Sequence, residues 1–200
     1  MRTHEFTNQE DWLAFRRGRI SGTRVKDVIV KRGTGRKICF YELIAEKLGV
    51  ESSEDENPME RGLRLEEEAI NRFRQESGKK VVAKLIIWTR DDNDNIAISP
   101  DAVIGKTEAL EVKCLSSAKH LEAYLTQSVP AEYQDQAIQY FVVNEKLKTL
   151  YFAFFDPRLP VKQFFYLTLS RKMFAEKIAE YEEVEKMILN DVMDAVKSLQ

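Results

Sequence analysis

The stretch spanning residues 81–114 constrains the fold most, because there the chain changes from helical spacing to the composition of strands. Its runs are rich in β-branched residues, and residues 91–94 and 105–108 have the chemistry of tight turns. Two neighbouring hairpins are expected, giving three or four adjacent antiparallel strands. The predicted strands are, in chain order, 81–89, 96–99, 102–104 and 109–114.

Helical spacing dominates on both sides of these strands. Gly78 is placed to end the helix before them, since glycine favours the conformation that closes helix C-termini. The predicted helices are 11–15, one capped by Ser21 or Thr23, 40–48, 59–77, 118–125, 131–143 and 171–198, and two further strands are expected at 149–155 and 163–169. This order predicts an α+β domain with helices flanking a mixed sheet.

Composition bounds the class of protein. The chain has 200 residues, of which 44% are apolar, enough for one domain, or one domain with a helical extension, and for a sizeable core. Its two cysteines, Cys39 and Cys114, are too few for a disulfide framework or a four-cysteine metal site. Residues 1–8 lack an apolar signal region, and no run of about 18 apolar residues could span a membrane. A cytoplasmic protein without membrane contact is expected.

Charge is divided unevenly along the N-terminal third. Residues 1–40 hold ten Lys and Arg against four acids, whereas residues 41–70 hold three against ten. A basic segment beside an acidic one is consistent with a phosphate-binding surface next to a metal site. The commoner origin of such a pattern is two solvated helix faces that attract each other. Charge therefore suggests nucleic acid without deciding for it.

Two acids and a lysine stand at the ends of the second hairpin. Asp101 precedes one strand, and Glu111-Val112-Lys113 lies in the next after nine intervening residues. Because side chains alternate along a strand, Glu111 and Lys113 face one side and Val112 faces the core. The hairpin lets Glu111 lie across from Asp101, so that both carboxylates can hold one hard cation with the Val112 carbonyl. Lys113 is then placed to hold or activate water and to neutralise charge on a phosphate.

The alternative for these residues is an exposed arrangement of ion pairs. Cross-strand ion pairs are common in hairpins and are each worth under about 1 kcal/mol. The apolar residues of the two hairpins favour a shared cavity instead, and Pro100 stops the strand where a ligand must point outward. These apolar residues are Ile96, Ile98, Val103, Leu110 and Val112.

The same residues resemble a known signature. Pro100-Asp101 followed by Glu111-Val112-Lys113 resembles the PD-(D/E)xK motif, and the surrounding chain is similar to the lambda-exonuclease family, the viral (phage) recombination exonuclease branch of that nuclease superfamily. The resemblance runs from Trp12 to the terminal helix and implies a restriction-endonuclease-like core. Its blocks are Arg16-x-Gly18-x-Ile20-x-x-Thr23, Gly62-x-x-x-Glu66, Ser99-Pro100-Asp101, Glu111-Val112-Lys113-Cys114, Tyr133-x-x-Gln136 and Phe155-Asp156-Pro157-Arg158.

For catalysis, the resemblance implies a two-metal mechanism with Mg²⁺, for which Mn²⁺ would substitute. The implied metal ligands are Asp101, Glu111, the Val112 carbonyl and, for the second ion, Glu66. The implied catalytic residues are Lys113, Glu111, Asp101 and Gln136, the last orienting Lys113 or the attacking water. Glu66 has an alternative, since a run of three glutamates is by default a solvated helix face, and Gln136 could be an ordinary polar helix residue.

For DNA, the resemblance implies a pocket that holds a terminal 5′-phosphate. The implied residues are Arg16, Thr23 and Ser99 for the phosphate, Arg32 for the duplex groove, and Met59 as a wedge between terminal base pairs. An arginine suits the phosphate because its guanidinium bonds two oxygens at once. Met59 could instead be an apolar staple at the start of its helix.

The resemblance as a whole implies a Mg²⁺-dependent 5′→3′ exodeoxyribonuclease that leaves 3′ single strands for recombination. It implies a single nuclease domain over 1–200, with a basic DNA-end-binding part (1–50), a catalytic core (59–170) and a C-terminal helix (171–200). It also implies a homotrimeric ring around DNA, a single-strand annealing protein as partner, and the cytoplasm of a bacterial host. The alternatives are an endonuclease or junction resolvase with the same core, or a DNA-binding module without catalysis.

Overall fold

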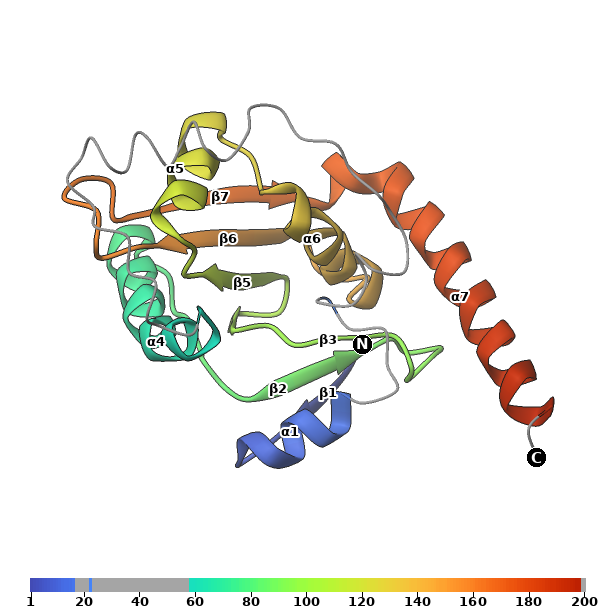
Figure 1. The fold of residues 1–200 in the computed structure, drawn as a ribbon. Coiled ribbons are helices and arrows are strands. Elements are labelled where there is room, and N and C mark those ends of the chain that lie inside the picture. The colour runs from blue at the N-terminus through green and yellow to red at the C-terminus, as the bar shows by residue number, and fades with distance from the viewer. Residues whose placement is uncertain (17–21, 23–57, 199–200) are drawn as a thin grey trace.

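The computed structural model describes residues 1–16, Gly22 and 58–198, whose arrangement is shown in Figure 1. The first helices and strands are β1 (Arg2–Glu5), α1 (Gln9–Arg16), α4 (Pro58–Ser77), β2 (Ile86–Thr89) and β3 (Ala97–Ile98). They are followed by β4 (Ala102–Ile104), β5 (Glu108–Lys113), α5 (Ser117–Thr126), α6 (Ala131–Val143), β6 (Thr149–Phe155), β7 (Phe164–Ser170), the 3₁₀ helix η1 (Arg171–Phe174) and α7 (Ala175–Ser198). The helices predicted between residues 21 and 48 lie outside the described residues.

Strands β4, β5, β6 and β7 form a mixed four-stranded sheet in that order. β5 and β6 run parallel, with Lys113 opposite Phe154, whereas the other two pairs are antiparallel. A parallel pair needs a long crossover, which α5 and α6 supply. The carboxyl ends of β5 and β6 therefore meet at the same edge of the sheet. The predicted α+β fold with a mixed sheet is confirmed.

The other sheet contains β1, β2 and β3, and it corrects the predicted strand grouping. The two hairpins do not continue one another as adjacent antiparallel strands: the chain leaves β3 and enters β4 in the second sheet, and Pro100 lies between them. Proline has no N–H to donate, so it interrupts a ladder at this point. Only residues 86–89 of the predicted strand 81–89 pair with β1 and β3, while Val82 makes a single bridge to Val103.

Alternation along β5 places its residues against two different helices. Leu110 and Val112 belong to an apolar cluster with residues of α4, whereas Ala109 belongs to a cluster with residues of α6 and α7. Because successive side chains of a strand point to opposite faces, Glu111 and Lys113 share the face of Ala109. The strand thus buries one row against α4 and presents its charged row to α6.

The long helix α4 ends where its sequence predicts. Helix α4 ends before Gly78, whose φ of +67° lies in the left-handed region and whose N–H donates to the Arg74 carbonyl at 3.0 Å.

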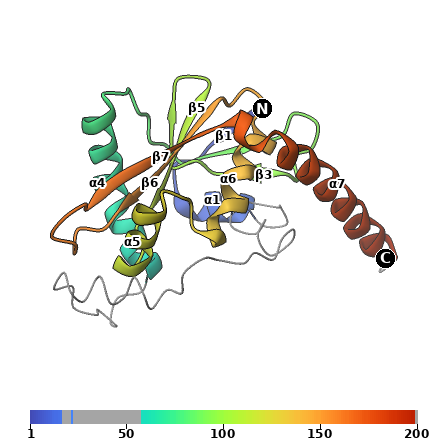
Figure 2. The ribbon, with the colours of Figure 1, turned by 90° about the horizontal axis from the view of Figure 1, so that it is seen from above.

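Helix α7 packs against α6 near its start. Tyr181 of α7 is buried and donates to Asp135 of α6 at 2.5 Å. The C-terminal part of α7 extends away from both sheets in two views (Figures 1 and 2). None of the described helices has the length and apolar character that a membrane span requires.

Candidate active site

The β4–β5 hairpin brings Asp101 and Glu111 opposite each other. Ala102 pairs with Leu110, so the antiparallel register carried back by one residue places Asp101 across from Glu111. Asp101 Oδ2 accepts a hydrogen bond of 2.7 Å from the backbone N–H of Val112, which fixes the carboxylate against β5. Both acids therefore lie at one end of a single hairpin, as the spacing predicts.

Three donors hold the Glu111 carboxylate. Lys113 Nζ donates to Glu111 Oε1 at 2.6 Å, and Gln136 Nε2 of α6 donates to the same oxygen at 2.5 Å. The hydroxyl of Tyr140 donates to the other oxygen, Oε2. Glu111 is only 2% exposed, so these bonds replace the water that the buried carboxylate has lost.

Tyr140 is a site residue that the sequence analysis missed. It lies one helical turn after Gln136, so both side chains leave α6 on the same face. Burial, followed by the charges of Glu111 and Asp101, raises the pKa of Tyr140 well above its ordinary value, which keeps the hydroxyl protonated as a donor. The four-residue spacing from Gln136 was the available signal.

Glu66 approaches this group from α4. Burial, followed by the charge of Glu111, raises the pKa of Glu66, and Lys113 lowers it by less. Its neighbours Glu67 and Glu68 are exposed, whereas Glu66 is half-buried. The solvated-face alternative therefore fits Glu67 and Glu68 but not Glu66.

Acidic groups outnumber the one basic group at the site. Burial first, then Glu111 and Glu66, raise the pKa of Asp101 well above its ordinary range. Burial opposes the charge on Lys113, but the carboxylates of Glu111 and Asp101 outweigh it and raise the pKa of the ammonium. One ammonium thus faces three carboxyl groups, an arrangement that a divalent cation would neutralise.

The donor set suits a hard cation. Carboxylates and a backbone carbonyl are oxygen ligands that suit Mg²⁺. Within the described ranges, no three side chains of Asp, Glu, His or Cys are arranged so that they alone could hold a metal ion. Asp101 and Glu111 would therefore hold an ion together with the Val112 carbonyl and water molecules. Mg²⁺ in proteins usually keeps several waters and binds only one or two carboxylates.

The residues predicted to bind a DNA end are only partly described. The Ser99 hydroxyl is buried and has no hydrogen-bond partner among the described residues, and the Ser99 carbonyl accepts from Tyr140 at 3.3 Å. Arg16 ends α1 and Met59 lies in the first turn of α4, but their side chains lie outside the described parts of the chain. Thr23 and Arg32 lie outside the described residues altogether.

The turn after β6 supports the same edge of the sheet. Asp156 is fully buried, accepts from Ser117 of α5 at 2.5 Å, and pairs with Arg158 Nε at 2.8 Å. Arg158 also donates to the Leu115 carbonyl at 3.0 Å. Burial raises the pKa of Asp156, but the bonds from Arg158 and Ser117 outweigh it and lower the pKa. This network ties the turn to the segment that follows the charged strand.

Gly22 is a second residue that the sequence analysis missed, because a glycine in a polar stretch indicates only a turn. It is buried, and a Cβ there would lie 2.1 Å from Ile98 Cδ1 and 2.8 Å from Gln136 Cγ. Real Cβ atoms do not approach other atoms so closely, so only glycine lets the backbone pass beside Gln136.

Gly22→Ala is therefore expected to destabilise the protein by about 1–3 kcal/mol, the usual cost of overpacking, and to lower nuclease activity by displacing Gln136. Urea unfolding and DNA degradation would measure the two effects. Adding Ile98→Val removes Cδ1, the closest atom, so the double variant should regain stability but not activity. Unfolding of Gly22→Ala at the parent's urea concentration would contradict the close approach.

Two opposed carboxylates, a lysine two residues after the second of them and a mixed sheet flanked by helices define the class: the chain has the fold of the PD-(D/E)xK nucleases. It belongs to the YqaJ-like viral recombinase family, whose sequence profile matches residues 11–146. The predicted resemblance to the lambda-exonuclease type of viral recombination protein is confirmed.

Solved structures with this fold agree with the assignment. The crystal structure of an alkaline exonuclease (LHK-Exo) from Laribacter hongkongensis matches at 26% identity and a TM-score of 0.72, covering 95% of this chain and 97% of that one. The same enzyme in complex with dAMP matches equally well. A phage-related exonuclease from Haemophilus somnus 129PT shares the fold at 12% identity and a TM-score of 0.52, over 89% of this chain and 96% of that chain. No curated protein sequence matches the chain.

Proposed function

We propose that this protein is a Mg²⁺-dependent 5′→3′ exodeoxyribonuclease that degrades one strand of duplex DNA and leaves a 3′ single strand for recombination. The observation that carries the proposal is the buried group of Asp101, Glu111 and Lys113, in which two carboxyl groups face one ammonium. The family and the similarity to an alkaline exonuclease support the same activity. In that family, a divalent ion is the expected cofactor.

The metal ligands of the proposal are Asp101, Glu111 and the Val112 carbonyl, with Glu66 serving a second ion. Bound divalent ions would activate a water molecule and stabilise charge on the attacking and leaving oxygens of the phosphodiester. Gln136 and Tyr140 hold Glu111 in place, because each donates to one of its oxygens. A ligand that is already fixed loses little entropy when the cation arrives.

Lys113 is the proposed catalytic residue beside these ligands. Its ammonium stays charged among the carboxylates, so it can donate to a phosphate oxygen or to the attacking water. Positive charge fixed at this point stabilises the negative charge that builds up on the phosphate during displacement. Gln136 donates to the same Glu111 oxygen as Lys113, which supports the proposed role of Gln136 in orienting Lys113 or the attacking water.

Recognition of the DNA end is assigned to Arg16, Thr23 and Ser99 at the 5′-phosphate, with Arg32 on the duplex groove and Met59 as the wedge. Support comes from Ser99, whose buried hydroxyl lies two residues before Asp101. A buried hydroxyl that has no partner in the described part of the chain has lost hydrogen bonds to water, which a phosphate oxygen would restore.

The proposal extends to assembly, partner and compartment. A homotrimeric ring would place the basic N-terminal part, which holds ten Lys and Arg in residues 1–40, around the duplex. A single-strand annealing protein would receive the 3′ strand, in the cytoplasm of a bacterial host infected by a phage. Static light scattering of the free protein tests the ring, since a trimer has three times the chain's mass of 23.3 kDa.

Activity on three forms of one DNA tests polarity and end recognition. With Mg²⁺, linear duplex carrying a 5′-phosphate should release mononucleotides from that end at least tenfold faster than the 5′-hydroxyl form, because the phosphate adds charge-assisted hydrogen bonds worth about 1.5–3 kcal/mol each. End-labelled products resolved on a gel would measure the rates. Cleavage of closed circles would indicate an endonuclease or junction resolvase, and tight binding without cleavage would indicate a DNA-binding module.

A further inference from the structure

The ammonium of Lys113 is held by the Glu111 carboxylate, which the proposed function also assigns to the metal ion. Its short contact is with Glu111 Oε1, an oxygen that already accepts from Gln136. A carboxylate that shares its charge with a divalent cation attracts an ammonium less strongly. Lys113 therefore needs a second contact that is independent of the carboxylates.

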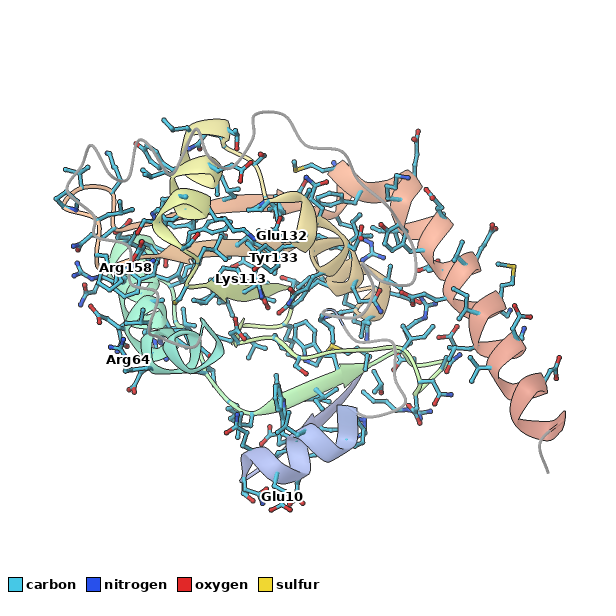
Figure 3. The ribbon with its side chains drawn as sticks, viewed as in Figure 1. Glu10, Arg64, Lys113, Glu132, Tyr133 and Arg158 are labelled. Atoms are coloured by element: carbon cyan, nitrogen blue, oxygen red, sulfur yellow. The ribbon has the colours of Figure 1, made fainter. Side chains whose placement is uncertain are left out.

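Tyr133 provides such a contact from the first turn of α6. Lys113 Nζ lies over its ring at 4.9 Å from the centroid, within the range of a cation–π interaction, and Figure 3 shows the two side chains next to each other. The side chain of Lys113 is only 16% exposed. Cation–π attraction is stronger when the cation is desolvated, so this contact should exceed its worth at a surface.

The Tyr133 ring packs against the sheet, and the start of the helix that carries it is tied to a neighbouring helix. The ring packs against Phe152 of β6, with centroids 6.4 Å apart. The preceding residue, Glu132, forms an ion pair with Lys119 of α5, which ties the start of α6 to the neighbouring helix. These contacts do not involve the charges around Lys113, so they should persist when those charges change.

We propose that Tyr133 is a positioning residue for the reaction: the face of its ring keeps the Lys113 ammonium at the scissile phosphate while Glu111 serves the metal ion. The proposal rests on the proposed function of Lys113. It assigns the effect to the ring face and none of it to the hydroxyl, so the conservative variant Tyr133→Phe is its control.

The test compares Tyr133→Phe with Tyr133→Leu, which keeps an apolar side chain but has no ring. On phosphorylated linear duplex, Tyr133→Leu should lower kcat by about 10- to 30-fold with KM within twofold of the parent, as expected for the loss of a desolvated cation–π contact. Tyr133→Phe should stay within twofold of the parent in both. In a Lys113→Met background the Leu substitution should cost nothing further.

Two readouts are independent of activity. Ca²⁺ affinity measured by calorimetry should be the same for the parent, Phe and Leu variants, because the ring is not a metal ligand. A crystal structure of the Leu variant should show Lys113 Nζ displaced from its position in the parent. Should Tyr133→Leu fail to fold, Tyr133→Met is the second ring-free variant, with the same expectations.

Each outcome separates the two proposals. Full activity of the ring-free variants, with Lys113→Met inactive, would overturn the role of Tyr133 and leave the proposed function standing. A loss in Tyr133→Phe as large as in Tyr133→Leu would assign the effect to the hydroxyl and likewise overturn it. Full activity of Lys113→Met itself would overturn the proposed function.

Discussion

Lys113→Met is expected to lower kcat on linear duplex DNA by roughly 10²- to 10⁴-fold, the range that a positioned proton donor or acceptor contributes. Methionine keeps an unbranched side chain of similar length, so the packing against Tyr133 is largely retained while the charge and the three N–H donors are lost. Single-turnover degradation of end-labelled duplex with Mg²⁺ would measure the effect. KM should change little, because the ammonium acts mainly when charge develops on the phosphate.

Lys106→Met is the matched control for this experiment. Lys106 is exposed in the turn that connects β4 and β5. Its substitution therefore removes one positive charge from the same hairpin without changing a residue of the site. Its activity should equal that of the parent. Equal losses in Lys106→Met and Lys113→Met would show that the hairpin's charge, rather than Lys113, supports the reaction.

Asp101→Asn is expected to abolish most of the activity. In the absence of metal ions it is also expected to raise the free energy of unfolding. Loss of a proposed metal ligand should remove several kcal/mol of transition-state stabilisation, which corresponds to roughly 10³-fold in rate. The amide oxygen can still accept from the Val112 N–H, so the hairpin geometry should persist. The substitution also relieves the repulsion among Asp101, Glu111 and Glu66.

The pH dependence of stability gives this prediction its sign. Because the pKa of Asp101 is raised in the folded protein, the unfolded chain loses the proton first as pH rises, and stability falls between the unfolded pKa near 4 and the higher folded pKa. In EDTA, urea unfolding should therefore show Asp101→Asn more stable than the parent at pH 8, with the difference shrinking toward pH 4. A parent that gains more stability than the variant between pH 4 and pH 8 would contradict the cause.

Added Ca²⁺ provides the complementary measurement. A ligand that binds only the folded state at about 100 times its Kd stabilises it by about 2.7 kcal/mol. The parent should show a rise in Tm with Ca²⁺, and Asp101→Asn should show little. An equal rise in both proteins would place the ion elsewhere.

The hairpin was predictable because its signals are local. Alternation along residues 109–113 identifies the charged face, and turn chemistry at 105–108 fixes the return of the chain, which Gly105 makes with a φ of +61°. Helix α6 and strand β6 have the bounds that periodicity predicts, 131–143 and 149–155. Each has a continuous pattern of its own.

The remaining features depend on contacts between distant parts of the chain. β1 (Arg2–Glu5) has a polar sequence and is a strand because it pairs with β2. Its residues do not alternate between apolar and polar, so the sequence does not predict it. Tyr140 looks like a core aromatic until Glu111 is placed beside it. The division into two sheets likewise depends on β5 pairing with β6, a partner that residues 81–114 do not contain.

The crossover between β5 and β6 has a consequence for how the chain can vary in length. A parallel pair could be connected by any segment long enough to return, but here the connecting segment also carries Tyr133, Gln136 and Tyr140. The segment that connects the two strands also carries residues of the candidate site, so an insertion or deletion between Lys113 and Thr149 would shift the face of α6 that contacts Glu111. Related chains should therefore accommodate extra residues at the exposed 91–95 and 105–106 turns instead.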